Sequence, residues 1–235
     1  MATKDFAHLH VHTEYSMLDG AARLGDLFTH AKELGMKSMA TSDHGFLFGA
    51  FDFWRQAKAH DIKPIIGVEA YLTPGTHRTD RSRVRWGDGS RDDVSGGGAY
   101  THMTMWAETT EGMHNLFRAS SIASLEGQLY KPRMDREVLQ TYSKGLIATT
   151  GCPSGEIQTR LRLGQFDEAI QAASDFRDIF GKDNFYCEVM DHGLDIERNV
   201  QEDLHRLAKQ LNLPYVATND LHYTRQEDHT AHAAL

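Results

Sequence analysis

The sequence contains few cysteines and no long hydrophobic run, and each scarcity excludes a class of protein. Its 235 residues include two cysteines, Cys152 and Cys187, which are too few for a disulfide framework. No apolar stretch approaches the roughly 18 residues that cross a bilayer. The first residues also lack the basic and then apolar pattern of a signal peptide. We therefore expect a cytoplasmic protein that does not act at a membrane.

Acidic residues outnumber basic ones and give a formal net charge of −8. This balance argues against a surface that coats nucleic acid along its whole extent. A local phosphate site stays open, because bound cations add positive charge that a residue count omits. The chain also has 14 histidines, which invites a search for metal ligands. Its length suits one large domain or two small ones and is enough for a substantial core.

Short apolar runs alternate with amphipathic stretches along the chain. Seven runs are typical of strands, at residues 6–10, 37–41, 64–72, 101–107, 145–149, 184–189 and 214–218. Between them apolar residues recur at helical spacing, as at Phe166, Ala169, Ile170 and Ala173. This alternation predicts an α/β fold with a parallel sheet and helical crossovers. About seven units favour a closed or nearly closed barrel, and an open doubly wound sheet is the alternative.

One segment, residues 73–99, interrupts the alternation. It is rich in glycine, arginine and aspartate, and its arginines include Arg83 and Arg85. A loop of this length inside a compact domain is usually functional or disordered. Two interpretations stay open: a solvated surface loop of mixed charge, or a flap whose arginines guide a phosphate backbone.

Two short motifs place paired metal-binding side chains at alternate positions. His10 and His12 flank Val11 near the N-terminus, and Asp220 and His222 flank Leu221 near the C-terminus. Successive side chains of a strand point to opposite faces, so the two members of each pair point the same way. His10 and His12 can therefore hold one metal ion, and Asp220 and His222 place both donors on one face.

Further metal-binding side chains lie near the ends of predicted strands, namely Asp19, His44, Glu69, His102 and Cys152. In a βα barrel the loops that follow the strands meet at one rim, so these residues would converge. Alone, His44 would be read as a surface or capping residue and Cys152 as a small buried apolar residue. A buried Glu69, by contrast, needs a partner or a metal. The convergence of all these residues favours a metal site.

Together these motifs resemble those of the PHP domain family, named for polymerase and histidinol phosphatase. Four segments carry the resemblance: residues 10–20 (HVHTEYSMLDG), 65–71 (IIGVEAY), 149–156 (TTGCPSGE) and 217–223 (ATNDLHY). Within the family, the sequence looks most like the PHP domains of bacterial replicative DNA polymerase III alpha subunits, those of actinobacteria in particular. The resemblance extends over essentially the whole chain and implies a single domain over residues 1–235.

The resemblance implies a distorted (βα)7 TIM-like barrel with three divalent metal ions at the C-terminal ends of its strands. Carried over to this sequence, it assigns His10, His12, Glu69 and Asp220 to a first ion. A bridging Glu69, His102 and Cys152 would hold the second, and Asp19, His44 and His222 the third. A thiolate ligand favours zinc or iron, the oxygen-rich positions tolerate manganese, and magnesium fits less well.

The activity that the resemblance implies is a 3′→5′ exonuclease, which hydrolyses DNA at the primer 3′ end and so proofreads replication. Asp19, His44, Glu69 and Asp220 would take part in catalysis through the metals. In a longer subunit the partners would include polymerase domains and the sliding clamp, whereas the separate chain is expected to be monomeric. Candidate contacts to DNA or phosphate are Arg83, Arg85, Arg160, Arg162 and Arg198. For Arg160 and Arg162, a polar helix face is the alternative interpretation.

Two other functions are compatible with the sequence. One is a phosphomonoesterase of the histidinol phosphatase type, which would use the same metals in a more enclosed pocket. The other is a catalytically silent domain that stabilises or docks parts of a polymerase. The complete set of ligand-type residues favours an active hydrolase over a silent domain.

Overall fold

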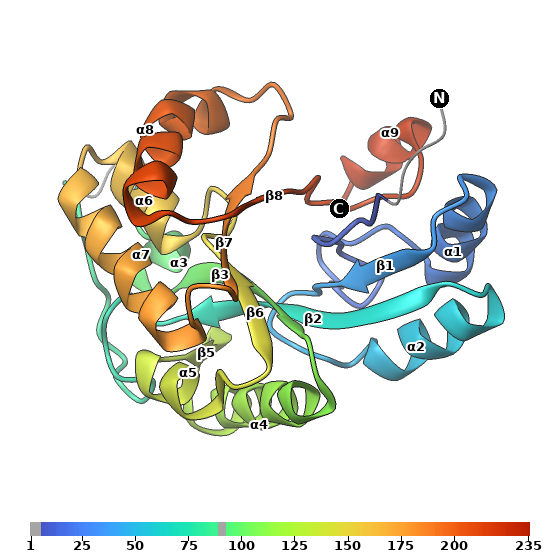
Figure 1. The fold of residues 1–235 in the computed structure, drawn as a ribbon, viewed down its shortest axis with the longest axis horizontal. Coiled ribbons are helices and arrows are strands. Elements are labelled where there is room, and N and C mark those ends of the chain that lie inside the picture. Colours follow the sequence, from blue (N-terminus) through green and yellow to red (C-terminus); the bar gives the residue numbers. More distant parts are fainter. Residues whose placement is uncertain (1–5, 89–92) are drawn as a thin grey trace.

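A curled mixed β-sheet forms the centre of the computed structural model, which describes residues 6–88 and 93–235 (Figure 1). In the described residues its strands are β1 (Ser38–Thr41), β2 (Lys63–Leu72), β3 (Thr101–Ala107), β4 (Gln128–Leu129), β5 (Lys131–Met134), β6 (Leu146–Thr149), β7 (Phe185–Val189) and β8 (Tyr215–Ala217). The strand order is β4-β5-β2-β3-β6-β7-β8, and β1 also pairs with β2.

The predicted all-parallel sheet is wrong at β3. This strand pairs antiparallel with β2 and with β6, whereas β1–β2, β2–β5, β6–β7 and β7–β8 are parallel. Neighbouring parallel strands need a crossover, usually a helix, but antiparallel strands do not. Between β2 and β3 the described chain contains the short α3 (Ser95–Gly98) and otherwise loop, so the chain returns beside β2 in the opposite direction.

The predicted strand at residues 6–10 is also wrong, because this segment makes individual backbone contacts without becoming a strand. It lies between β1 and the segment after β8: Ala40 N donates to His8 O at 2.8 Å, and Leu221 N donates to His10 O at 3.0 Å. Val11 and Leu221 form an isolated parallel bridge. Residues 6–10 therefore connect the two sides of the curled sheet through single hydrogen bonds, where the sequence predicts the first strand of a barrel.

Helices cover the sheet on both sides of the long strand β2 (Figure 1). They are α1 (Leu24–Glu33), α2 (Ala50–Ala59), α4 (Thr110–Glu126), α5 (Arg136–Tyr142), α6 (Glu156–Arg162), α7 (Phe166–Phe180) and α8 (Asp195–Leu211). The short helices η1 (Gln226–Asp228) and α9 (His229–His232) follow β8. One apolar core joins β2, β3, β6 and β7 to α4, α5, α6, α7 and α8, and a second lies between α1, α2 and β1. In the described part of the chain no helix is long and apolar enough to cross a membrane.

An arginine on β5 binds the backbone of the 73–99 loop. Residues 89–92 of this loop lie outside the described residues. Arg133 on β5 is 1% exposed and donates to the backbone oxygens of Arg78, Asp80, Ala99 and Gly127. A buried guanidinium is costly unless its donors are satisfied, and four carbonyls satisfy this one. Arg133 therefore holds both ends of the loop against β5.

Candidate metal centre

Segments far apart in the sequence bring nine ligand-type side chains to one place in the fold. Some lie within strands, with Glu69 in β2 and His102 in β3. The others lie in connecting segments: His10, His12 and Asp19 before α1, His44 after β1, Cys152 after β6, and Asp220 and His222 after β8. These are the residues that the sequence predicts as ligands, and their role in binding metal stays a prediction.

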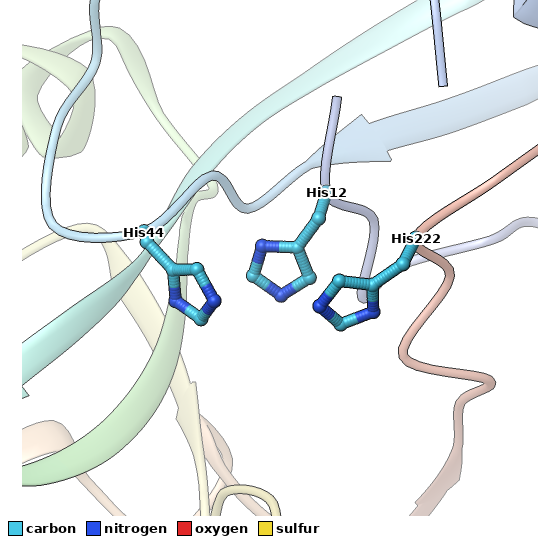
Figure 2. A group of neighbouring side chains, drawn as sticks. All are labelled: His12, His44 and His222. Carbon is cyan, nitrogen blue, oxygen red and sulfur yellow. The ribbon is translucent and has the colours of Figure 1, made fainter. Parts of the chain in front are cut away.

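Three histidine rings face one another on one side of the site (Figure 2). The ring of His12 lies 4.1 Å from that of His44 and 4.3 Å from that of His222, measured between centroids. Asp19 completes this group, with its Oδ2 atom 3.0 Å from His44 Nε2 and 4.0 Å from His222 Nε2. Asp19 is 42% exposed, so this side of the site opens to solvent.

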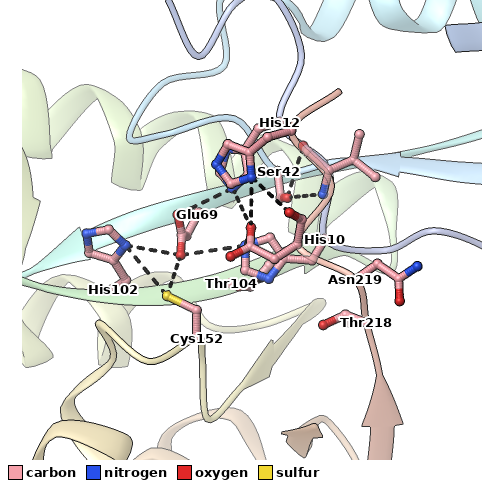
Figure 3. A network of polar contacts seen from close by, with 12 residues as sticks. His10, His12, Ser42, Glu69, His102, Thr104, Cys152, Thr218 and Asn219 are labelled. Carbon is pink, nitrogen blue, oxygen red and sulfur yellow. Dashed lines mark hydrogen bonds and ion pairs between the residues drawn. The ribbon is translucent and has the colours of Figure 1, made fainter. Parts of the chain in front are cut away.

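Glu69 lies at the centre of the network and is 1% exposed (Figure 3). Its Oε1 atom is 3.1 Å from both His102 Nδ1 and Cys152 Sγ. Its Oε2 atom is 2.7 Å from His44 Nδ1, although the two atoms are not aligned for a hydrogen bond. One carboxylate thus contacts the groups on both sides of the site.

His10 and His12 are fully buried (Figure 3), and both lie beside Asp220, which is 22% exposed. Asp220 Oδ1 lies 3.3 Å from His10 Nε2 and 3.2 Å from His12 Nε2. Asp220 has a φ of 44°, a left-handed conformation that aspartate adopts more readily than most residues. The alternation that the sequence predicts for His10 and His12 does bring both imidazoles to one carboxylate.

Buried polar atoms without hydrogen-bond partners indicate whether this site suits cations. Among the described residues, six buried atoms of the cluster have no hydrogen-bond partner: His10 Nε2, His12 Nε2, Asp19 Oδ1, His44 Nδ1, Glu69 Oε2 and Asp220 Oδ1. Buried polar atoms without partners are rare and costly. Ligands about 2.0–2.1 Å from a tetrahedral zinc ion lie about 3.3 Å from one another, and Asp220 Oδ1 lies at about this distance from His10 Nε2 and from His12 Nε2. The residues present therefore fit divalent cations.

The carboxylates and imidazoles of the cluster shift one another's protonation. Burial disfavours the charged form of His10, but Asp220 and Glu188 outweigh it and raise the pKa of His10 well above its ordinary value. Burial also disfavours ionised Glu69, yet His102 and His10 hold its pKa well below the usual range. Glu69 therefore stays ionised, in the form that binds a cation, and cation binding would displace protons from the cluster.

His12 and Cys152 differ in how ready they are to bind a cation. Burial lowers the pKa of His12 to about 4, so its imidazole is neutral at pH 7 and can act as a ligand. Burial, followed by the charges of Glu69 and Asp220, raises the pKa of Cys152 well above its ordinary value. The Cys152 thiol donates to Glu69 Oε1, and it must lose this proton to bind a metal.

A buried glutamate that the sequence analysis missed orients His10. Glu188 on β7 is fully buried, and its Oε1 atom lies 2.7 Å from His10 Nδ1. The hydroxyls of Thr149 and Thr218 also donate to this carboxylate. Its contact with Nδ1 directs His10 Nε2 toward Asp220, as carboxylates behind metal-binding histidines commonly do. In the sequence, Glu188 could have been recognised as the charged residue of the otherwise uncharged segment Phe185–Val189.

Asp43 gives His12 a similar support through a serine. Its carboxylate accepts hydrogen bonds from Thr13 N at 2.6 Å and from Ser16 Oγ at 2.8 Å. Ser16 Oγ in turn lies 3.0 Å from His12 Nδ1. Thr41 Oγ1, at the end of β1, also donates to Asp43. Asp43 therefore connects β1 with Thr13, next to His12. Asp43 precedes His44 in the sequence, and only the fold reveals that it supports a different histidine.

Several of the arginines predicted to contact DNA already have partners within the chain. Arg160 lies over the Trp86 ring at 3.7 Å, and Arg162 donates to Pro153 O. Arg83 donates to the backbone oxygens of Gly96 and Gly97 and to the Tyr130 hydroxyl. Arg85 and Arg198 have exposed side chains, on the 73–99 loop and on α8 respectively. Contact of these five arginines with DNA stays a prediction.

Comparison with known proteins identifies the family of this chain. The model of the PHP domain family matches residues 8–192. DNA polymerase III subunit alpha of Saccharopolyspora erythraea is 58% identical over 100% of this chain, and that of Mycobacterium leprae is 53% identical over 100%. The corresponding Deinococcus radiodurans protein is 44% identical over 99% of the chain. The chain spans 20%, 20% and 17% of the lengths of these three relatives.

Solved structures with low sequence identity share the fold. A Chromobacterium violaceum amidohydrolase, solved with bound sulfate and without metal, aligns with a TM-score of 0.54 at 13% identity. A Bifidobacterium adolescentis protein, assigned as a metal-dependent phosphoesterase, aligns with a TM-score of 0.51 at 14% identity. Each alignment covers 94% of this chain and 89% of the other. With the family match and the relatives that span its length, the chain belongs to the PHP domain family, in the form found in DNA polymerase III alpha subunits, actinobacterial ones included.

Proposed function

We propose that this chain is a metal-dependent 3′→5′ exonuclease that removes nucleotides from the primer 3′ end during DNA replication. The observation that carries the proposal is the convergence of six unsatisfied buried atoms in one cluster of histidines and carboxylates. A protein that had lost this chemistry would have no reason to retain so many costly buried groups. Its similarity to DNA polymerase III alpha subunits favours DNA as the substrate.

Three divalent cations, zinc, manganese or iron, would occupy the cluster. The assigned groups are His10, His12, Glu69 and Asp220, then Glu69, His102 and Cys152, and finally Asp19, His44 and His222. Bound divalent cations supply positive charge to a phosphodiester and lower the pKa of water. In this proposal the curled sheet and the 6–10 segment together form the distorted (βα)7 barrel of the family.

The chain's own residues would orient these ligands and admit the substrate. Glu188 and Ser16 hold the outer nitrogens of His10 and His12, so both Nε2 atoms stay directed into the site. The phosphodiester would enter beside Asp19, which is the more exposed side, and stop above the buried Glu69. In the longer relatives the polymerase domains would present the primer end, and the sliding clamp would keep them on DNA.

The test is degradation of a 5′-labelled primer with a 3′ mismatch by protein loaded with Mn²⁺ or Zn²⁺. We expect stepwise shortening that stops when a chelator is added. Asp19→Asn should lose the activity, because it removes a charged ligand on the exposed side of the cluster. Asp26→Asn is the matched control, since Asp26 is an exposed aspartate of α1 and lies outside the cluster.

Metal content and folding are measured in the same samples. Folded protein that carries three metal equivalents and leaves the primer intact would contradict the exonuclease proposal. Release of phosphate from histidinol phosphate by such protein would then support the phosphomonoesterase function. Inactivity on both substrates would support a structural or docking domain.

A further inference from the structure

An aromatic pocket adjoins the metal centre on its exposed side. The pocket has a volume of about 210 Å³ and shares two residues, Asp19 and His44, with the cluster. Phe46, Phe48 and Tyr71 line it, and Lys131 adds an ammonium group. Typical small-molecule sites measure about 300–1,000 Å³, so this pocket suits one small planar group.

The aromatic lining starts at the cluster and continues to the surface. The Tyr71 ring stacks on His44, with centroids 5.9 Å apart and an interplanar angle of 22°. The Phe46 and Phe48 rings are stacked at 4.5 Å and 14°. Phe48 is 70% exposed, which leaves much of its ring free to contact a ligand.

A tight turn fixes this aromatic pair relative to the cluster. Gly45, between His44 and Phe46, has a φ of +69°, and its amide donates to Glu69 O at 2.9 Å. Phe46 N donates to His44 O at 2.8 Å across the turn. His44 therefore contacts Glu69 while Phe46 lines the pocket, and the two cannot move far apart.

We propose that this pocket binds the base of the 3′-terminal nucleotide, stacked on the exposed ring of Phe48. The inference rests on the proposed exonuclease function, because that reaction holds the phosphate of the terminal nucleotide at the cluster. The base of that nucleotide must then lie next to the cluster. The pocket meets this requirement, because Asp19 and His44 belong both to the pocket and to the cluster. Every base has a π-face, so aromatic stacking accepts any terminal base, as an exonuclease requires.

Lys131 gives the pocket a second feature suited to a nucleotide. Its Nζ atom lies 5.3 Å from the centroid of the Tyr71 ring. The ammonium group is thus held beside the pocket, where it can contact a phosphate of the bound strand. A site for an apolar protein segment would gain nothing from a lysine and an aspartate at its edges.

The experiment compares two ligands that differ only in the base. Thymidine 5′-monophosphate and 2-deoxyribose 5-phosphate are titrated into the metal-loaded protein by calorimetry, and phosphate release is monitored. We expect the nucleotide to bind about tenfold more tightly, which corresponds to one base–aromatic stack. Phe48→Ala should remove this preference. Phe51→Ala is the matched control, because Phe51 is also 70% exposed but does not line the pocket.

The outcomes separate this inference from the proposed function. Equal affinity for the two ligands, no measurable nucleotide binding, or a preference that survives Phe48→Ala would each overturn the base pocket. Equal affinity in a protein that still shortens primers would leave the exonuclease proposal intact. A base preference in a protein that shortens no primer would support the pocket and contradict the nuclease.

Discussion

His10 is held on both sides of its ring, and both contacts are needed for its role. Its Nε2 atom lies beside Asp220, and Nδ1 lies beside the buried Glu188. The Glu188 carboxylate is itself fixed by the hydroxyls of Thr149 and Thr218. Such a carboxylate selects the tautomer of the imidazole and raises its basicity toward a metal. In the proposed metal centre, Glu188 would therefore position a ligand without contacting the metal.

Glu188→Gln should weaken metal binding about 10–100-fold, the usual effect of losing such a support. The amide keeps the volume of the carboxylate but loses its charge, so His10 becomes a poorer ligand. The measurement is a metal titration in competition with a chelating dye. Glu168→Gln, an exposed change on α7, should leave the affinity unchanged. Equal affinity of the Glu188→Gln and wild-type proteins would contradict this role.

Gly45 is required at the turn between the cluster and the aromatic pocket. Its φ of +69° is strained for residues with a side chain, and an added Cβ would lie 2.7 Å from the Tyr71 ring. Gly45→Ala should lower the free energy of unfolding by about 1–3 kcal/mol. Urea denaturation provides the measurement.

Gly25→Ala is the natural control for this substitution. Gly25 lies in α1, and an added Cβ would contact nothing within 4 Å. Alanine favours helix over glycine, so this variant should be more stable than wild type by up to about 1 kcal/mol. If Gly45→Ala and Gly25→Ala change the free energy of unfolding in the same direction, the explanation for Gly45 is wrong.

At the scale of the elements, Asp135 joins a helix end to the 73–99 loop. Its side chain accepts a hydrogen bond from Val138 N at 3.0 Å and so caps α5. It also accepts one from Arg78 N at 2.9 Å and pairs with the Arg78 guanidinium. Burial opposes ionisation, but these donors outweigh it and hold the pKa of Asp135 below its ordinary value.

The direction of this shift fixes the pH dependence of the stability that Asp135 contributes. A carboxyl with a lowered pKa in the folded state stabilises the protein above its unfolded pKa, about 3.9. That contribution is lost as the pH falls through the folded pKa. Wild type should therefore exceed Asp135→Asn in unfolding free energy most at pH 7, and the gap should narrow below about pH 4. Denaturation of both proteins across this range is the test, and a gap that widened in acid would contradict the prediction.

At the scale of the whole molecule, the cluster joins parts of the chain that are remote in sequence. His10 and His222 belong to its opposite ends, and Glu69 and Cys152 lie between them. Without cations, six buried cluster atoms lack hydrogen-bond partners. Cations bound there would hold the native state together, because the unfolded chain cannot assemble the same ligands.

Metal removal should therefore lower the melting temperature. A cation at 100 times its dissociation constant stabilises a protein by about 2.7 kcal/mol per site. Thermal unfolding with Mn²⁺ or Zn²⁺, and with a chelator, measures the effect. The variant Asp19→Asn should show a smaller shift, whereas Asp26→Asn should behave as wild type. If the melting temperature is the same with metal and with chelator, cations at the cluster do not stabilise the fold.

The sequence by itself determined the α/β class and the nine residues that meet in the cluster. The alternate spacing of His10 and His12 predicts that their side chains point the same way, and both imidazoles do lie beside Asp220. Most strands could be predicted because they are short segments rich in apolar residues, as β2 and β3 are. These features depend on local periodicity, which a sequence displays directly.

Only the tertiary structure decided the direction of β3, the extended course of residues 6–10, and the support given by Glu188 and Asp43. Strand direction depends on how a loop returns, and the 73–99 loop is fixed by Arg133, which belongs to a later strand. Glu188 is 178 residues away from the histidine it orients. Contacts between residues so far apart leave no periodic signal, because they exist only once the chain has packed.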